Sequence, residues 1–264
     1  MNKINIIDTA QEYKNNKKNI DKAVLNVLKS GVYINGPEVK SFENELSKFL
    51  NVRHCISCAN GTDALTIALK SLNLEKNSEV IIPAMTYCST AFSVFNANLK
   101  PVLVDTEYLS STIDINKLKN KITNKTKVIM PVHLYGSVAD IGQIRKIIKN
   151  KKIFIIDDCA QAHGASDNKG NKIGSISDIS TFSLYPGKNL GAYGDAGIIT
   201  TNSNFLNKKI RKIRNLGSEK KFIHDTIGFN SRLDTIQAII LNYKLKNLEN
   251  LNQKRRKIAK KYDQ

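Results

Sequence analysis

Four short apolar runs, separated by segments with helical spacing, constrain the fold of this chain most strongly. They are Val80–Ile82, Val102–Val104, Val128–Met130 and Ile153–Ile156. Such runs, rich in Val and Ile, are typical of strands that are buried on both faces of a parallel sheet. Because strands and helices alternate, we expect an open, mostly parallel α/β sheet. Ligands bind beyond the carboxyl ends of such strands, so the functional residues should follow these runs.

The segments around these runs carry apolar residues at helical spacing. A helix is predicted over Asn19–Lys29, a second begins at Pro37, and a third follows Asn60–Asp63. Ile141–Ile148 is predicted to form another helix between two of the strands. The segment Leu233–Tyr262 is predicted to form one long helix.

Composition limits the class of protein. The chain has 264 residues, of which 41% are hydrophobic, so it can bury a sizeable core. No apolar stretch is long enough to span a bilayer, and the first residues lack the apolar core of a signal peptide. We therefore expect a cytoplasmic protein without a membrane partner.

The formal net charge is +18, and Lys254–Lys257 is the densest basic run. A charge of this size can indicate a nucleic-acid partner. Aromatic residues are not interleaved with the charges, as a base-stacking surface would require. A solvated helix face is therefore the favoured interpretation. A non-catalytic basic regulatory or nucleic-acid-binding protein is the alternative from a different class.

Cys55 and Cys58 form a C-x-x-C pair, which occurs in redox and zinc sites. The segment around the pair has an extended pattern, so the two side chains should point to opposite faces of a strand. The sequence contains no second pair. We therefore interpret both cysteines as buried structural residues, expect no metal, and interpret His133 in the same way.

Three polar motifs follow predicted strands. Asn60–Leu65 places a glycine and a hydroxyl at the start of a helix, where free N–H groups bind a phosphate, although an ordinary turn with an N-cap has the same pattern. Asp157 and Asp158 end an apolar run, where a carboxylate can pair with a cationic ligand atom, bind a metal or cap a helix. Lys188 lies in a glycine-bracketed loop, where a desolvated amine can form a Schiff base.

The order of phosphate loop, strand-end acid and loop lysine is that of fold type I enzymes, which use pyridoxal 5'-phosphate (PLP). The chain resembles the DegT/DnrJ/StrS family of nucleotide-sugar aminotransferases, and more closely the members that aminate a sugar at C3 than those that aminate at C4. The resemblance implies the large domain of a fold type I PLP-transferase, with helices flanking a mostly parallel central sheet. The segments that carry it are Tyr33–Val39, Asn60–Leu65, Pro131–Gly136, Asp157–Gly164, Ser183–Gly197 and Gly228–Asp234.

The resemblance implies a role for each matching residue. Lys188 would form the Schiff base with PLP, and Asp158 would face the pyridine nitrogen, so these two are the expected catalytic residues. Gln161 would lie beside the phenolic oxygen of PLP, and Tyr87 would stack on its ring. The remaining expected contacts are those of Gly61, Thr62 and Ser183 with the phosphate, of Asn230 with a neighbouring subunit's phosphate, and of Arg232 with the sugar nucleotide.

The implied activity moves an amino group from an amino acid, expected to be L-glutamate, to C3 of a dTDP- or UDP-linked keto-sugar. The product would serve amino-sugar and surface-polysaccharide biosynthesis. A homologue that aminates at C4 is the alternative within the family. A related sugar dehydratase replaces the Schiff-base lysine, whereas Lys188 is present here. Because Asn230 would complete a neighbouring site, the resemblance implies a homodimer, and it implies no nucleic-acid partner.

The resemblance also divides the chain. Residues 1–235 would form the PLP-binding large domain, including the N-terminal helical segment. Residues 236–264 would begin a long helix that leads to a C-terminal small domain, and we expect that domain to be essentially absent from this sequence.

Overall fold

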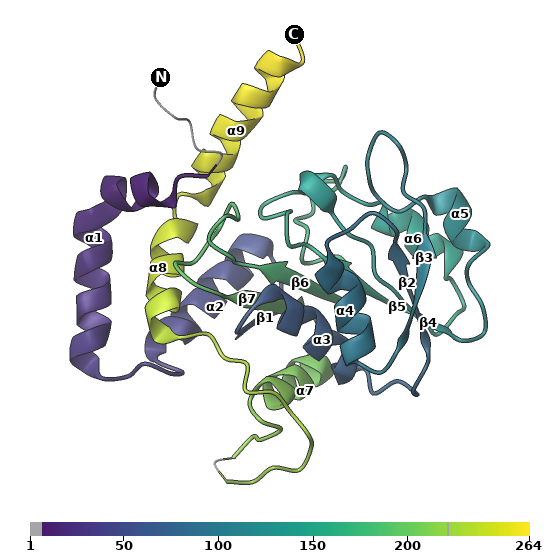
Figure 1. Ribbon diagram of the computed structural model, residues 1–264, viewed down its shortest axis with the longest axis horizontal. Coiled ribbons are helices and arrows are strands. Elements are labelled where there is room, and N and C mark those ends of the chain that lie inside the picture. Colours follow the sequence, from purple (N-terminus) through teal and green to yellow (C-terminus); the bar gives the residue numbers. More distant parts are fainter. Residues whose placement is uncertain (1–6, 221) are drawn as a thin grey trace.

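A twisted sheet lies at the centre of the molecule, with helices on both of its faces (Figure 1). The computed structural model describes residues 7–220 and 222–264. Within them the sheet has seven strands in the order β1-β7-β6-β5-β4-β2-β3. The strands are His54–Cys58 (β1), Glu79–Pro83 (β2), Lys100–Val104 (β3), Thr126–Ile129 (β4), Phe154–Asp158 (β5), Ile179–Ser183 (β6) and Gly197–Thr201 (β7).

Helices separate most of the strands along the chain, as the sequence predicts. They are Thr9–Ser30 (α1), Pro37–Leu50 (α2), Gly61–Ser71 (α3), Cys88–Asn96 (α4), Ile115–Lys119 (α5), Ile141–Ile147 (α6), Asn204–Arg214 (α7), Thr235–Leu245 (α8) and Leu248–Tyr262 (α9), with a short 3-10 turn at Leu134–Gly136 (η1). Among these described helices, none combines the length and apolar character that crossing a membrane requires. The cytoplasmic location stays a prediction.

The sheet is mostly parallel, as the alternation predicts. Strands β3, β2, β4, β5 and β6 run parallel to one another, whereas β7 is antiparallel to both β6 and β1. In the parallel pair β5–β6, Asp158 lies opposite Thr181. The carboxyl ends of the parallel strands therefore meet at one edge of the sheet, where open α/β sheets bind their ligands.

The four apolar runs form β2, β3, β4 and β5, which confirms the prediction. Burial on both faces holds for the central strands, since Ile81 and Ile129 on one face and Ile82 and Val128 on the other are all fully buried. In β3, however, Leu103 is 55% exposed. The reason is that β3 is an edge strand, which has a hydrogen-bonded neighbour on one side only.

Two core clusters cover the opposite faces of β1 and β7. Cys55 belongs to the cluster that contains α2 and α8, and Cys58 belongs to the cluster that contains α3 and α7. Both thiols are buried, which confirms the prediction of structural cysteines on opposite faces. Burial raises the pKa of Cys58 to about 12, so this thiol stays protonated and unreactive.

Two helices differ from the prediction. Helix α1 begins at Thr9, ten residues before the predicted start, because Asp8 caps its first turn by accepting the backbone N–H of Gln11 at 2.8 Å. The predicted single helix at the end of the chain is wrong. It is interrupted after α8 at residues 246–247, and α9 begins at Leu248. This interruption is needed because α8 packs against α2, whereas α9 projects away from the sheet (Figure 1).

The apolar core continues past the predicted domain boundary at residue 235. Ala238, Leu241 and Leu245 of α8 are buried in the same cluster as α2, and Leu248 at the start of α9 joins them. In α9, every residue after Asn252 is exposed. Helix α8 is therefore part of the structure that surrounds the sheet.

Candidate active site

A cavity of about 850 Å³ lies at the carboxyl edge of the parallel strands. Residues at or just beyond the ends of β2, β4, β5 and β6 line it, as does the N-terminus of α3. Seven of the nine predicted site residues are among them, namely Gly61, Thr62, Tyr87, Asp158, Gln161, Ser183 and Lys188.

Asp158 is the last residue of β5, and its carboxylate is buried beneath the cavity. Its Oδ2 accepts the hydroxyl of Thr90 at 2.8 Å, and its Oδ1 accepts the backbone N–H of Ala160 at 3.1 Å. Burial raises the pKa of Asp158, although these two hydrogen bonds oppose the shift. A buried carboxylate of this kind gains stability when a cationic group enters the cavity beside it.

Lys188 lies in the loop between β6 and β7, and its side chain is half-buried. The backbone N–H of Lys188 donates to the carbonyl of Tyr185 at 2.8 Å, which closes a tight turn. The turn also needs Gly191, because a Cβ there would lie 2.5 Å from the carbonyl oxygen of Pro186. Burial lowers the pKa of Lys188, and the Asp158 carboxylate opposes that shift. The amine is therefore more readily deprotonated than an exposed lysine.

The N-terminus of α3 faces the cavity and carries the predicted phosphate loop. Asn60 caps the helix by accepting the backbone N–H of Asp63 at 2.8 Å. A Cβ at Gly61 would lie 2.7 Å from the Cβ of Ser183, so a glycine is required for the loop to approach β6 this closely. The hydroxyl of Thr62 lies 2.8 Å from that of Ser89. Free helix N–H groups beside these hydroxyls form a cradle that suits a phosphate.

Gln161 and Tyr87 lie at the wall and the mouth of the cavity. The side-chain carbonyl of Gln161 accepts the backbone N–H of Tyr135 at 2.7 Å, so its amide nitrogen is the end that can donate to a ligand. Tyr87 precedes α4 and is 70% exposed, which leaves its ring available to cover a bound group. Both placements agree with the contacts that the resemblance implies.

Asn230 and Arg232 are the two predicted site residues that do not line this cavity. They follow the loop that leaves α7, where Asn230 is exposed and pairs with Asn215 in an isolated bridge. The guanidinium of Arg232 donates to the side chain of Asn215 at 3.4 Å. Their assigned roles with a neighbouring subunit and with the nucleotide stay predictions.

The structure adds residues that the sequence reasoning missed. Thr90 donates to Asp158, and Thr86 lies 2.8 Å from Thr90 on the first turn of α4. Ser231 connects the segment of Asn230 to the phosphate loop, because its hydroxyl donates to Asp63 at 2.7 Å. No spacing in the sequence indicates the bond between Thr90 and Asp158, because the two residues are 68 positions apart.

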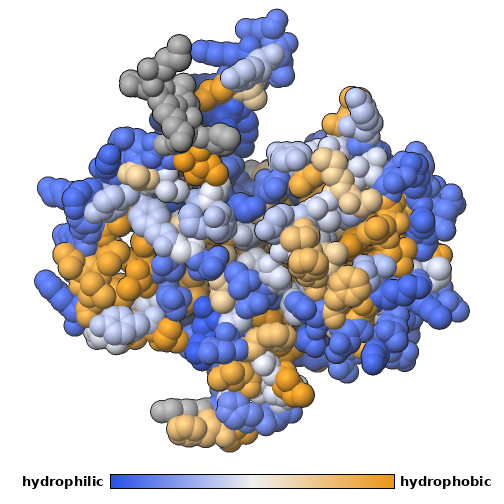
Figure 2. Space-filling model, viewed as in Figure 1, coloured by the Kyte–Doolittle hydropathy of each residue, from blue (hydrophilic) through white to orange (hydrophobic). Residues whose placement is uncertain are grey.

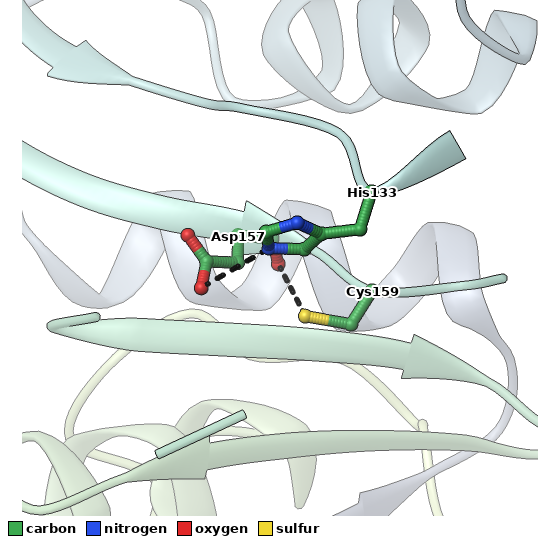
Figure 3. Close-up of side chains that lie close together, drawn as sticks. All are labelled: His133, Asp157 and Cys159. Atoms are coloured by element: carbon green, nitrogen blue, oxygen red, sulfur yellow. Dashed lines mark hydrogen bonds and ion pairs between the residues drawn. The ribbon is translucent and has the colours of Figure 1, made fainter. Parts of the chain in front are cut away.

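Three side chains behind the cavity form a buried cluster (Figure 3). One possible ligand atom each from His133, Asp157 and Cys159 lies within 4.8 Å of the others. The chemistry of the set favours hydrogen bonding over metal binding. The Cys159 thiol lies 3.8 Å from the backbone oxygen of Asp157, and burial raises its pKa well above the ordinary value, which disfavours the thiolate that a metal needs.

Comparisons with known proteins agree with this geometry. The sequence profile of the DegT/DnrJ/EryC1/StrS aminotransferase family matches residues 14–264. The chain is 44% identical over 259 residues to the dTDP-3-amino-3,6-dideoxy-alpha-D-galactopyranose transaminase of Aneurinibacillus thermoaerophilus, which covers 98% of this chain and 71% of the relative.

Two solved structures are also similar. The crystal structure of DesV from S. venezuelae, in complex with a ketimine intermediate, superposes with a TM-score of 0.96 at 36% identity, covering 99% of this chain and 70% of DesV. The structure of ntda from Bacillus subtilis with the bound cofactor PMP gives a TM-score of 0.88 at 34% identity, covering 94% of this chain and 57% of that protein.

The fold is that of the PLP aminotransferases. In this chain Lys188, Asp158 and the N-terminus of α3 lie around one cavity. Within that class, the chain belongs to the DegT/DnrJ/EryC1/StrS aminotransferase family.

Proposed function

We propose that this chain uses PLP to move an amino group from an amino acid, expected to be L-glutamate, to C3 of a nucleotide-linked keto-sugar. The observation that carries the proposal is the placement of Lys188 and Asp158 in one cavity with the N-terminus of α3. The similarity to a dTDP-3-amino-sugar transaminase supports amination at C3. Amination at C4 is the alternative within the family.

The residues present fit PLP. The raised pKa of Asp158 reports a buried carboxylate that lacks a full counter-charge, which a pyridinium nitrogen would supply. The close approach of Gly61 to Ser183 brings the start of α3 and the hydroxyl of Thr62 beside the hydroxyl of Ser183, an arrangement that suits a phosphate. Lys188, Asp158, Gln161, Tyr87 and the phosphate cradle would together hold the cofactor. PLP, when bound, supplies an electron sink for the negative charge that develops at the donor α-carbon.

Each of these residues would then have a separate role in the reaction. Burial lowers the pKa of Lys188, so its amine would act as the base that takes the proton from the donor α-carbon and passes it to the bound cofactor. In the second half of the reaction it would move a proton from the cofactor to C3 of the sugar. Asp158 would hold the pyridine nitrogen in its protonated form, and Thr90 would keep that carboxylate in position. Gln161 would donate its amide N–H to the ring oxygen. Because the donor would leave as its keto acid before the keto-sugar enters the same cavity, ping-pong kinetics are expected.

A homodimer is part of the proposal. Phe92 and Phe95 of α4 are 55% and 59% exposed, and apolar surface lies over α4 beside the cavity mouth (Figure 2). Exposed apolar side chains of this kind favour a covering partner. A second copy of the chain would cover them, and Asn230 would then reach the phosphate in the partner's site. Light scattering of the wild type and of Phe95→Glu measures this state directly.

The test of the function is an absorbance spectrum of the purified chain with PLP, before and after borohydride. A visible band that borohydride traps covalently, and that Lys188→Ala abolishes, is the expected result. Lys169→Ala, which removes an exposed lysine outside the cavity, is the control and should leave the band unchanged. Folded protein without a trapped band would overturn the proposal. Analysis of the aminated sugar product by NMR then distinguishes C3 from C4.

A further inference from the structure

Asp63 places a negative charge beside the phosphate cradle. It lies in the first turn of α3 and lines the main cavity together with the cradle residues Gly61, Thr62 and Ser183. A carboxylate in this turn stabilises the helix, because the helix dipole is positive at its N-terminus. The same charge would repel a phosphate bound at that helix end. Phosphate binding therefore depends on where the Asp63 carboxylate is held.

The hydroxyl of Ser231 holds that carboxylate. Ser231 is fully buried, and its Oγ donates to Oδ2 of Asp63 at 2.7 Å. Asp63 lines the cavity, whereas Ser231 does not. The hydrogen bond therefore keeps one oxygen of the carboxylate engaged with a group that lies outside the cavity lining.

The same hydroxyl also contacts the other end of the phosphate loop. Ser231 Oγ accepts the backbone N–H of Ala59 at 3.1 Å, and Ala59 directly precedes Asn60, the N-cap of α3. Asn60 in turn accepts the backbone N–H of Asp63 at 2.8 Å. Both ends of the segment 59–63 are thus bonded to one buried oxygen. A hydroxyl has a single hydrogen to donate, and here Asp63 receives it.

Ser231 is itself held at the end of α7. Its backbone N–H donates to the carbonyl of Arg214 at 3.0 Å, and the backbone N–H of Phe229 donates to the carbonyl of Ile213 at 2.6 Å. Ile213 belongs to the same apolar cluster as Leu65 of α3. The serine therefore reaches the phosphate loop from a segment that is bonded to α7, and α7 packs against the helix that carries the loop.

We propose that Ser231 is a positioning residue of the phosphate cradle, whose hydroxyl holds the Asp63 carboxylate away from the bound phosphate and fixes the loop before α3. This role rests on the proposed function, because it takes the phosphate of PLP as the ligand of the cradle. The adjacent Asn230 is predicted to reach the phosphate in a partner's site. Neighbouring residues of one segment would then serve the chain's own cradle and that of its partner.

The experiment compares the dissociation constants of PLP and of pyridoxal, which lacks the phosphate, by absorbance titration of the full chain. Ser231→Ala frees the Asp63 carboxylate, so PLP binding should weaken by about tenfold, whereas pyridoxal binding should change by less than about twofold. Ser231→Cys keeps the size of the side chain and donates only weakly, so it should show the same selective loss even if the alanine variant folds poorly. Ser71→Ala is the matched control, because it removes a buried hydroxyl that bonds to the carbonyl of Ala68 at the far end of α3.

A second substitution separates the effect of charge from that of packing. Asp63→Asn removes the negative charge and keeps an acceptor oxygen. The double variant Ser231→Ala/Asp63→Asn should therefore recover most of the PLP affinity that Ser231→Ala loses. Because the two residues are in contact, their effects should not be additive. A purely structural role of Ser231 predicts no such recovery.

Four outcomes would contradict the assigned role. They are an unchanged PLP constant in both Ser231 variants, an equal weakening of PLP and pyridoxal, a similar selective loss in Ser71→Ala, and no recovery in the double variant. Borohydride trapping of PLP at Lys188 is measured on the same samples. If the wild type is trapped, any of these outcomes rejects only the role of Ser231, whereas a wild type that is not trapped rejects the proposed function.

Discussion

The imidazole Nε2 of His133 lies 3.5 Å from the Oδ2 of Asp157, and both side chains are fully buried. The backbone N–H of Ala139 donates to the other ring nitrogen at 3.1 Å, so the imidazole proton belongs on Nε2, facing the carboxylate. The backbone N–H of His133 also donates to the carbonyl of Asp158 at 3.0 Å. This backbone hydrogen bond joins the segment that follows β4 to the end of β5, where Asp158 lies.

Removal of the Asp157 carboxylate should destabilise the protein. Asp157→Ala removes the carboxylate that lies 3.5 Å from the buried Nε2–H, and we expect a loss of about 1–3 kcal/mol in the free energy of unfolding. Asp157→Asn keeps an acceptor oxygen and should lose less. Urea unfolding of the three proteins measures the difference. Equal losses in the two variants would show that His133 does not depend on this acceptor.

Replacement of Asp158 should have opposite effects on stability and on cofactor binding. Because its pKa is raised in the folded state, the folded chain holds this proton to higher pH than the unfolded chain does. The cofactor-free protein should therefore lose stability as the pH rises through that raised pKa, and Asp158→Asn should abolish the loss.

For PLP, Asp158→Asn should weaken binding by about tenfold to a hundredfold, since a charged partner of the pyridine nitrogen is lost. Thermal unfolding between pH 4 and 8, without and with PLP, measures both effects. A variant that matches the wild type in both series would contradict the assigned role.

The buried His163 should make the stability of the protein sensitive to acid. It is buried beside Phe182, its Nε2 lies 2.8 Å from the carbonyl of Ser183, and burial lowers its pKa from 6.5 to about 4. Between these values the unfolded chain binds a proton that the folded chain does not. Stability should therefore fall as the pH falls from about 6.5 to 4, by on the order of 3 kcal/mol from this group.

His163→Gln should remove this component, because a glutamine amide can still donate to the Ser183 carbonyl and does not titrate. The measurement is the slope of unfolding free energy against pH for the two proteins. Parallel curves between pH 4 and 6.5 would show that His163 does not contribute to the pH dependence of stability, and would contradict the prediction.

Asn252 should contribute to stability far more than its neighbour on the same helix. Asn252→Ala removes hydrogen bonds to the carbonyl of His163 and to Asn189, and we expect it to cost about 1–3 kcal/mol. Asn250 is exposed and bonds only within its own turn, so Asn250→Ala should be close to neutral. Hydrogen exchange in the loop of Lys188 should speed up in the first variant alone. Similar effects of both substitutions would exclude a specific connection between α9 and that loop.

Local chemistry explains which features were predictable. The apolar runs predicted β2 to β5, because a strand buried on both faces must be apolar throughout its length. The phosphate loop, the strand-end carboxylate and Lys188 were identified because each follows a strand at the sheet edge where ligands bind. The hydrogen bond from Thr90 to Asp158 was missed, since the two residues are 68 positions apart and no local pattern connects them.

The sequence by itself determined the four strands β2 to β5, the order of the site motifs and hence the family, because these depend on residue type and short-range spacing. Tertiary structure alone decided the antiparallel placement of β7 and the interruption between α8 and α9. It also decided the positions of Asn230 and Arg232 outside the cavity. These features depend on contacts between distant segments, where packing and buried hydrogen bonds select one arrangement among several that local preference allows.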